Sequence, residues 1–114
     1  MSSQFITSSL LENEPDLIDL VDKFISRLPG MRDDILKFHD EKDWSSFLNL
    51  IHQLKGVGGG YGYTMITDIC ASIEIACKDE DYAKVKQQLD EFINMSEQVL
   101  AGSEENRRIA RANV

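Results

Sequence analysis

The chain is organised around residues 51–62, which read IHQLKGVGGGYG, and five of these twelve residues are glycine. Each glycine inside a helix costs about 1 kcal/mol relative to alanine. The residues before them nevertheless carry a strong helical pattern, because apolar side chains recur at spacings of three and four: Trp44, Phe47, Leu48, Ile51 and Leu54. The sequence therefore predicts a central helix, from Trp44 to about Tyr61, whose C-terminal half needs bare backbone.

On a helical wheel of about 100° per residue, His52 falls beside the apolar face and points toward solvent. Three residues share its strip of the helix surface: Lys55, Gly56 and Gly59. The histidine is thus expected to be exposed beside a cation, with no side chain covering its C-terminal side. Gly58 is expected to face the core and let a neighbouring helix pack closely. Gly62 is expected to end the helix as a left-handed residue.

The segment His52-Gln53-Leu54-Lys55-Gly56, with Gly62 ten residues after the histidine, resembles the signature of histidine-containing phosphotransfer (HPt) domains of bacterial phosphorelays. The resemblance extends through Ile66, Cys70 and Glu74, and loosely over residues 13–100. The sequence departs from the family at residues 57–61, where Ser and Ala more often precede an aliphatic residue. It also has Ile51 where a small residue commonly precedes the histidine.

The resemblance implies a role for each matching residue. His52 would accept a phosphoryl group from a receiver-domain aspartate and pass it to another. Lys55 would offset the charge of the phosphoryl oxygens, or it is an ordinary surface lysine. Glu74 would accept a hydrogen bond from one imidazole nitrogen and fix the tautomer, or it is an ordinary outward-facing acid. Four residues are expected to shape the site: Leu48, Gly56, Gly59 and Gly62.

The implied partners are receiver domains of response regulators and a hybrid sensor kinase, and the Mg²⁺ that such transfer requires would be held by the receiver. No cofactor or metal is expected on this chain. It would be a phosphocarrier and not a kinase, because no ATP site is visible. The glycine run matches neither of the nucleotide-binding motifs G-x-G-x-x-G and G-x-x-x-x-G-K-S/T, and it follows a helix where those motifs follow a strand. The competing hypothesis is an acidic helical bundle that binds a signalling partner without carrying phosphate.

Composition narrows the class of protein. A single domain over residues 1–114 with a net charge of −8 is a poor partner for nucleic acid or an anionic membrane. No apolar run approaches the roughly 18–20 residues of a membrane span. The N-terminus lacks the pattern of a signal peptide, and two cysteines form no disulfide framework. We therefore expect a cytoplasmic, free-standing monomer.

Acidic residues are missing around the histidine. From Trp44 to Thr67 the chain has no Asp or Glu, where an even spread of its 20 acids would place about four. A site that receives a phosphoryl group would be weakened by acids of its own. A half-buried, glycine-rich helix with few surface positions would explain the same gap.

The predicted fold is all-α, an antiparallel four-helix bundle with a short N-terminal helical extension. Residues 1–12 are expected to form a leading helix, residues 13–102 the core, and residues 103–114 a frayed tail. Asn13 is expected to cap the first long helix, Pro29-Gly30 to break or kink it, and Asp43 to cap the central helix.

A metal site is the alternative for the residues of types that commonly bind metals, which are His39, His52, Cys70 and Cys77. Their spacings fit no zinc pattern. Cys70 and Cys77 lie seven residues apart on the apolar face of the helix after the central one, so both are expected in the core. His39 is expected in a polar turn.

Overall fold

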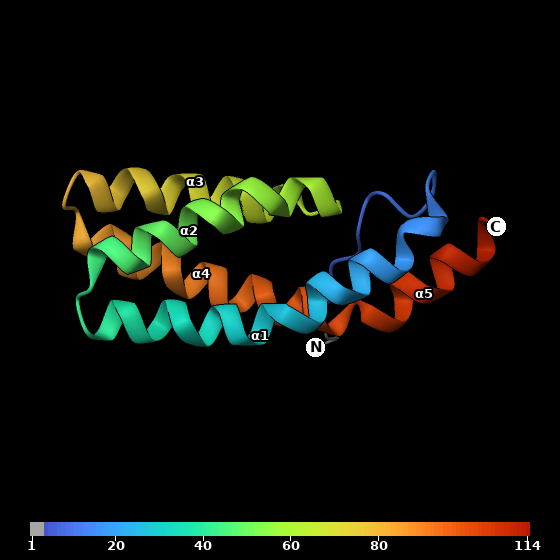
Figure 1. Cartoon of the computed structure of the whole chain (residues 1–114), viewed down its shortest axis with the longest axis horizontal. Helices are drawn as coiled ribbons and strands as arrows, with labels where there is room; N and C mark the ends of the chain where they lie inside the picture. The colour runs from blue at the N-terminus through green and yellow to red at the C-terminus, as the bar shows by residue number, and fades with distance from the viewer. Residues whose placement is uncertain (1–3) are drawn as a thin grey trace.

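The computed structural model describes residues 4–114, and within them the chain consists of helices and irregular segments, without strands. Four long helices lie side by side and alternate in direction, and a fifth projects from one end of the bundle (Figure 1). The all-α bundle predicted from the sequence is confirmed. The elements in chain order, with η for a 3₁₀ helix, are η1 (Pro15–Leu17), α1 (Ile18–Asp40), α2 (Trp44–Gly58), η2 (Gly59–Tyr61), α3 (Thr64–Lys78), α4 (Tyr82–Ala101) and α5 (Ser103–Ala112).

The core lies along the axis of the bundle, where the apolar faces of α1 to α4 meet. Each helix contributes side chains spaced three or four residues apart, as in the series Phe47, Ile51 and Leu54 of α2. Burying one such side chain stabilises the fold by about 1.5–3 kcal/mol. The fully buried residues on the other helices include Val21, Leu28 and Ile35 of α1, Ile66, Cys70 and Ile73 of α3, and Val85, Phe92 and Val99 of α4.

The ends of α2 follow local signals in the sequence. Asp43 caps the helix, because its Oδ1 accepts a hydrogen bond from the Ser46 backbone N–H at 3.2 Å. At the other end η2 continues the helical path for one turn. Gly62 then takes a left-handed conformation with φ of 89°, and its N–H donates to the Gly59 carbonyl. Both expectations for these ends, Asp43 and Gly62, are confirmed.

The start of α1 differs from the prediction, and at Pro29 the predicted break does not occur. Asn13 does not cap it, since η1 comes first and α1 begins only at Ile18. Pro29 lies inside α1 and does not break it, although the helix changes direction near its middle (Figure 1). Proline removes one helical hydrogen bond, but the buried residues Leu28 and Ile35 on either side of it pack into the same core, so the helix continues. His39 is accordingly in the last turn of α1 and not in a loop.

The predicted leading helix over residues 1–12 is wrong where it can be compared, in residues 4–12, which run without helix across the end of the bundle; residues 1–3 lie outside the described residues. Part of the backbone of this segment pairs with distant residues. The Ile6 N–H donates to the Gln98 carbonyl at 3.0 Å, and the Ser9 N–H donates to the Gly62 carbonyl at 3.0 Å. The N-terminal extension is therefore a strap, residues 4–14, over the ends of α2 and α4.

The predicted frayed tail at residues 103–114 is also wrong, since α5 spans most of it and lies beside the start of α1 (Figure 1). Asn106 is fully buried. Its Oδ1 accepts from the Ser8 N–H at 2.9 Å, and its Nδ2 donates to the Tyr63 hydroxyl at 2.9 Å. Arg107 pairs with Asp22 of α1 at 3.3 Å. These polar contacts hold a helix that carries few apolar residues.

Within residues 4–114, no helix combines the length and the apolar character that crossing a membrane would require.

Candidate functional site

His52 lies in the middle of α2, with its side chain 65% exposed. Its neighbours Ile51 and Leu54 are fully buried, so the helix is fixed against the core while the imidazole points outward. The histidine expected at the surface is found there. It is held on a rigid element, which favours a defined ring orientation.

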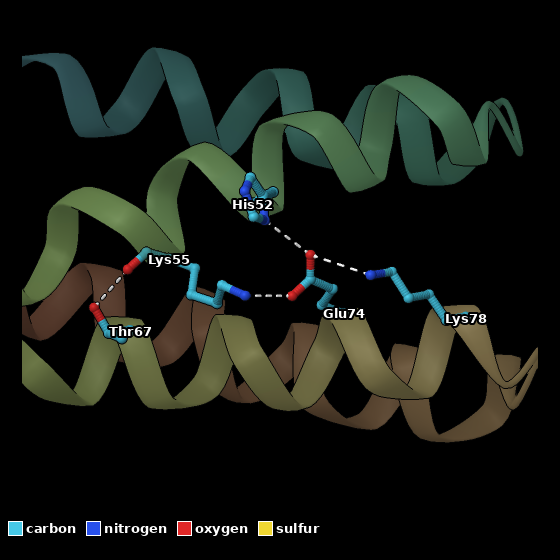
Figure 2. A network of polar contacts seen from close by, with 5 residues as sticks. All are labelled: His52, Lys55, Thr67, Glu74 and Lys78. Atoms are coloured by element: carbon cyan, nitrogen blue, oxygen red, sulfur yellow. Dashed lines mark hydrogen bonds and ion pairs between the residues drawn. The ribbon is translucent and has the colours of Figure 1, made fainter.

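Glu74 reaches the histidine from α3 (Figure 2). Its side chain is only 11% exposed, and its Oε2 lies 3.0 Å from Nδ1 of His52. Its other oxygen, Oε1, accepts a hydrogen bond from Nζ of Lys55 at 2.6 Å. A third group, Nζ of Lys78, lies 3.7 Å from Oε2. One carboxylate thus connects the imidazole to two ammonium groups.

The charge of Glu74 decides the tautomer of His52. The hydrogen bond from Lys55 lowers the pKa of Glu74, with help from His52 and the charge of Lys78, and together they outweigh the opposing effect of burial. An ionised carboxylate can only accept hydrogen bonds. In neutral His52, Nδ1 therefore carries the proton and donates a hydrogen bond to Oε2. The exposed Nε2 keeps a free lone pair.

The backbone near Lys55 is tied to α3 through Thr67. The Thr67 hydroxyl donates to the Lys55 carbonyl at 2.8 Å and accepts from the Gly59 N–H at 2.8 Å. This close approach of the two helices depends on Gly58, since a Cβ there would lie 2.9 Å from Cγ2 of Ile66. Gly58 faces the core as expected, and it brings α3, with Glu74, within reach of His52.

The remaining glycines of the segment divide into two groups. A Cβ added at Gly56 or Gly60 would meet nothing within 4 Å, so the surface is open at both positions, and Gly56 lies one turn after His52. A Cβ at Gly59 would lie 3.3 Å from the Thr67 hydroxyl. The expectation that Gly59 faces solvent is wrong. Gly59 keeps a helical conformation, but the first turn of α3 packs against it there, with Thr67 and Thr64 beside it. Leu48 is half-buried and packs against the core one turn before His52.

Lys78 and Thr67 were not identified from the sequence. Lys78 carries a usable signal, since it lies four residues after Glu74 and an acid followed by a lysine at this spacing is a favourable helical pair. Thr67 carries none, because its two backbone partners belong to the preceding helix and to the turn after it.

The cysteines and the second histidine do not join the site. Cys70 is fully buried one turn before Glu74, and burial, helped by the charge of Glu74, raises the pKa of its thiol to about 12. Cys77 is also buried. His39 packs its ring edge-on against Trp44. In the described part of the chain, no three His, Cys, Asp or Glu residues are grouped so that they could hold a metal ion.

A protein-family model described as Hpt domain matches residues 19–102, which include α1 to α4 apart from one residue at the start of α1. The strap and α5 lie outside the matched region. Comparison with curated proteins found no match, and neither did comparison with solved structures.

Proposed function

Since this chain belongs to the Hpt domain family, whose members act in phosphotransfer within two-component phosphorelays, we propose that His52 is its phosphoacceptor. The observation that carries this proposal is the state of the imidazole. Nδ1 is held by the buried Glu74 carboxylate, and Nε2 is exposed with its lone pair free. A neutral imidazole with one nitrogen fixed is a good nucleophile.

The proposed step is an in-line displacement at phosphorus. The Nε2 lone pair of His52 attacks the phosphorus of an aspartyl phosphate on a receiver domain. The N–P bond forms while the P–O bond to the aspartyl group breaks, and its electron pair returns to the carboxylate. The ring gains positive charge, which Glu74 stabilises through the Nδ1 proton. The reverse step delivers the phosphoryl group to a second receiver.

The surroundings of His52 suit such a partner. Gly56, one turn further along α2, leaves open space beside the ring, and a bulky receiver needs close access for in-line attack. Lys55 supplies a nearby positive charge for the phosphoryl oxygens. The Mg²⁺ that accompanies the transfer would be held by the receiver. The donor would be the receiver domain of a hybrid sensor kinase, and this chain would act as carrier.

A panel of phosphorylated receiver domains tests the proposal. Wild-type protein should take up the phosphoryl label, and the label should be lost in acid but survive in alkali, as expected for a nitrogen–phosphorus bond. The variant His52→Gln should fold and take up no label. The matched control is His39→Gln, which changes the other histidine of the chain and should be labelled like the wild type.

An acid-stable label, or full labelling of His52→Gln, would rule out the assignment. Stable binding of receivers without any labelling would favour the competing class, a helical interaction module that carries no phosphate.

A further inference from the structure

Two lysines share the carboxylate of Glu74, and they approach it from different helices. Lys55 of α2 binds Oε1 at 2.6 Å. Lys78, in the last turn of α3, lies 3.7 Å from Oε2, the oxygen that also binds His52. Figure 2 shows the two ammonium groups on either side of the carboxylate. The second cation has no role in the proposed transfer as described so far.

Lys55 cannot serve two anions equally well. In the unphosphorylated protein its ammonium is bound to Glu74. A phosphoryl group on Nε2 would lie on the side of the ring away from Nδ1, and therefore away from Glu74. When Lys55 turns toward the phosphoryl oxygens, its contact with Oε1 must lengthen. Glu74, only 11% exposed, would then lose the partner that most strongly favours its charged form.

We propose that Lys78 is a positioning residue that holds the Glu74 carboxylate against Nδ1 of His52 when Lys55 turns to the phosphoryl group. A partly buried carboxylate without a cation either takes up a proton or turns to water, and both weaken its hydrogen bond to the ring. This inference rests on the proposed function for the phosphorylated state. For the unphosphorylated protein, the inference states that either lysine alone is enough to hold the Glu74 carboxylate against Nδ1 of His52. This part does not depend on the proposed function.

The placement of Lys78 suits this role. It lies one turn after Glu74 on α3, the favourable order for a helical ion pair. Its side chain is 64% exposed, so it can adjust to the oxygen that needs it. Lys78 makes no other ion pair within residues 4–114. The other groups that face Glu74 are His52 and Lys55 from α2 and the protonated thiol of Cys70 from α3.

The experiment compares Lys55→Met, Lys78→Met and the double variant. Nitrogen-15 NMR of the unphosphorylated protein at about pH 8.5, some two units above the ordinary imidazole pKa, reports the tautomer of His52. Both single variants should keep the Nδ1–H tautomer, and the double variant should show a mixture. In single-turnover transfer from a phosphorylated receiver, Lys78→Met alone should slow transfer by at least about twofold, because Lys55 is then turned to the phosphoryl group and no other cation holds Glu74.

Two further variants separate positioning from bulk charge. Lys84→Met removes an exposed lysine of α4 that makes no ion pair in the described residues. The variant that combines Lys84→Met with Lys55→Met should keep the Nδ1–H tautomer of His52. Its loss in transfer rate should equal the product of the two single losses. Lys78→Arg in the Lys55→Met background should restore the tautomer and rate of Lys55→Met alone.

The proposal is overturned if the double variant keeps a single tautomer, if Lys55→Met alone already mixes the tautomers, or if Lys84→Met reproduces the effect of Lys78→Met. Failure of the proposed function would look different. In that case no variant and no wild-type protein would be labelled by receivers, while the tautomer spectra could still follow the expected pattern.

Discussion

The Nδ1 atom of His52 lies 3.0 Å from Oε2 of Glu74, although 22 residues separate the two and they stand on successive helices. This contact turns an exposed histidine into one with a defined proton. Because the pKa of Glu74 is lowered, chiefly by Lys55, the carboxylate remains an acceptor at neutral pH. In the proposed transfer, Glu74 therefore selects Nε2 as the reactive nitrogen without touching the phosphoryl group.

Replacing Glu74 by Gln should slow phosphoryl acceptance without unfolding the protein. The amide has nearly the same shape and can still accept from Lys55, but it no longer stabilises positive charge on the ring. A hydrogen bond to a charged group contributes about 1.5 kcal/mol or more, which is roughly tenfold in rate. Single-turnover transfer measures the loss. Asp68→Asn, an exposed acid on the same helix, should transfer at the wild-type rate, and an unchanged rate in Glu74→Gln would remove Glu74 from the mechanism.

The same residue should make stability depend on pH in the acid range. The folded-state pKa of Glu74 lies below its ordinary value of 4.5. Its contribution is therefore fully present above that value and is lost as the pH falls through the lowered pKa. The difference in unfolding free energy between wild type and Glu74→Gln should shrink below about pH 4.5, as measured by urea denaturation across the acid range. A constant difference would mean that the Glu74 pKa is not lowered by folding.

The sequence was most informative where local chemistry decides the structure. The Asp43 cap, the inward-facing Gly58 and the left-handed Gly62 each follow from residue type and helical position, and the structure has all three. Gly59 differs for a non-local reason. Its backbone is helical, as expected, but the first turn of α3 packs against it and places Thr67 where solvent was expected.

The contacts between distant segments could not be read in this way. Asn106 looks like one polar residue in a polar tail, yet it is fully buried because Ser8 and Tyr63 supply its hydrogen-bond partners. Nothing in the spacing of these three residues brings them together. The continuous helix through Pro29 is a similar case, since core packing on both sides outweighs the unfavourable local preference.

Asn106→Ala should destabilise the protein, because it leaves the Ser8 N–H and the Tyr63 hydroxyl without their partner in a buried site. Each unpaired buried group costs about 1–3 kcal/mol. The thermal midpoint should fall clearly, while transfer per folded molecule stays normal. Asn113→Ala, an exposed position at the end of α5, is the control and should change little. Equal midpoints for the two variants would mean that α5 is not held by this network.

Gly62→Ala should destabilise the protein more than any other alanine substitution in residues 56–62. The residue has φ of 89°, and a Cβ would collide with the Ser8 hydroxyl and lie 2.8 Å from the Ser9 backbone nitrogen. The left-handed conformation alone costs about 1–2 kcal/mol for a residue with a side chain. Gly60→Ala is the control, since nothing lies within 4 Å of its Cβ. A midpoint for Gly62→Ala equal to that of the control would contradict the strap's position over this turn.

The sharpest prediction compares substitutions at Gly56 with substitutions at Gly59. Those at Gly56 should lower transfer without lowering stability, and those at Gly59 should lower stability and not transfer. Gly56 faces open space one turn after His52. Alanine there should stabilise the helix by about 0.5–1 kcal/mol, and Gln or Leu should remain close to neutral. The same side chains would occupy the space that a receiver needs beside the imidazole. Transfer should therefore fall with side-chain size while the thermal midpoint holds or rises.

At Gly59 a larger side chain should lower stability and leave transfer nearly unchanged, the opposite of the effect expected at Gly56. A Cβ there meets the Thr67 hydroxyl at 3.3 Å, and a Leu would have to displace α3, at a cost of about 1–3 kcal/mol. Because a side chain at Gly59 points at Thr67 and Thr64 of α3 and not into the open surface at Gly56, transfer per folded molecule should be nearly unchanged. Thermal melts and single-turnover transfer on the two series measure both quantities. If bulky residues at Gly59 slow transfer as strongly as those at Gly56 without lowering the midpoint, the receiver approaches over η2, and the open surface at Gly56 is not its point of access.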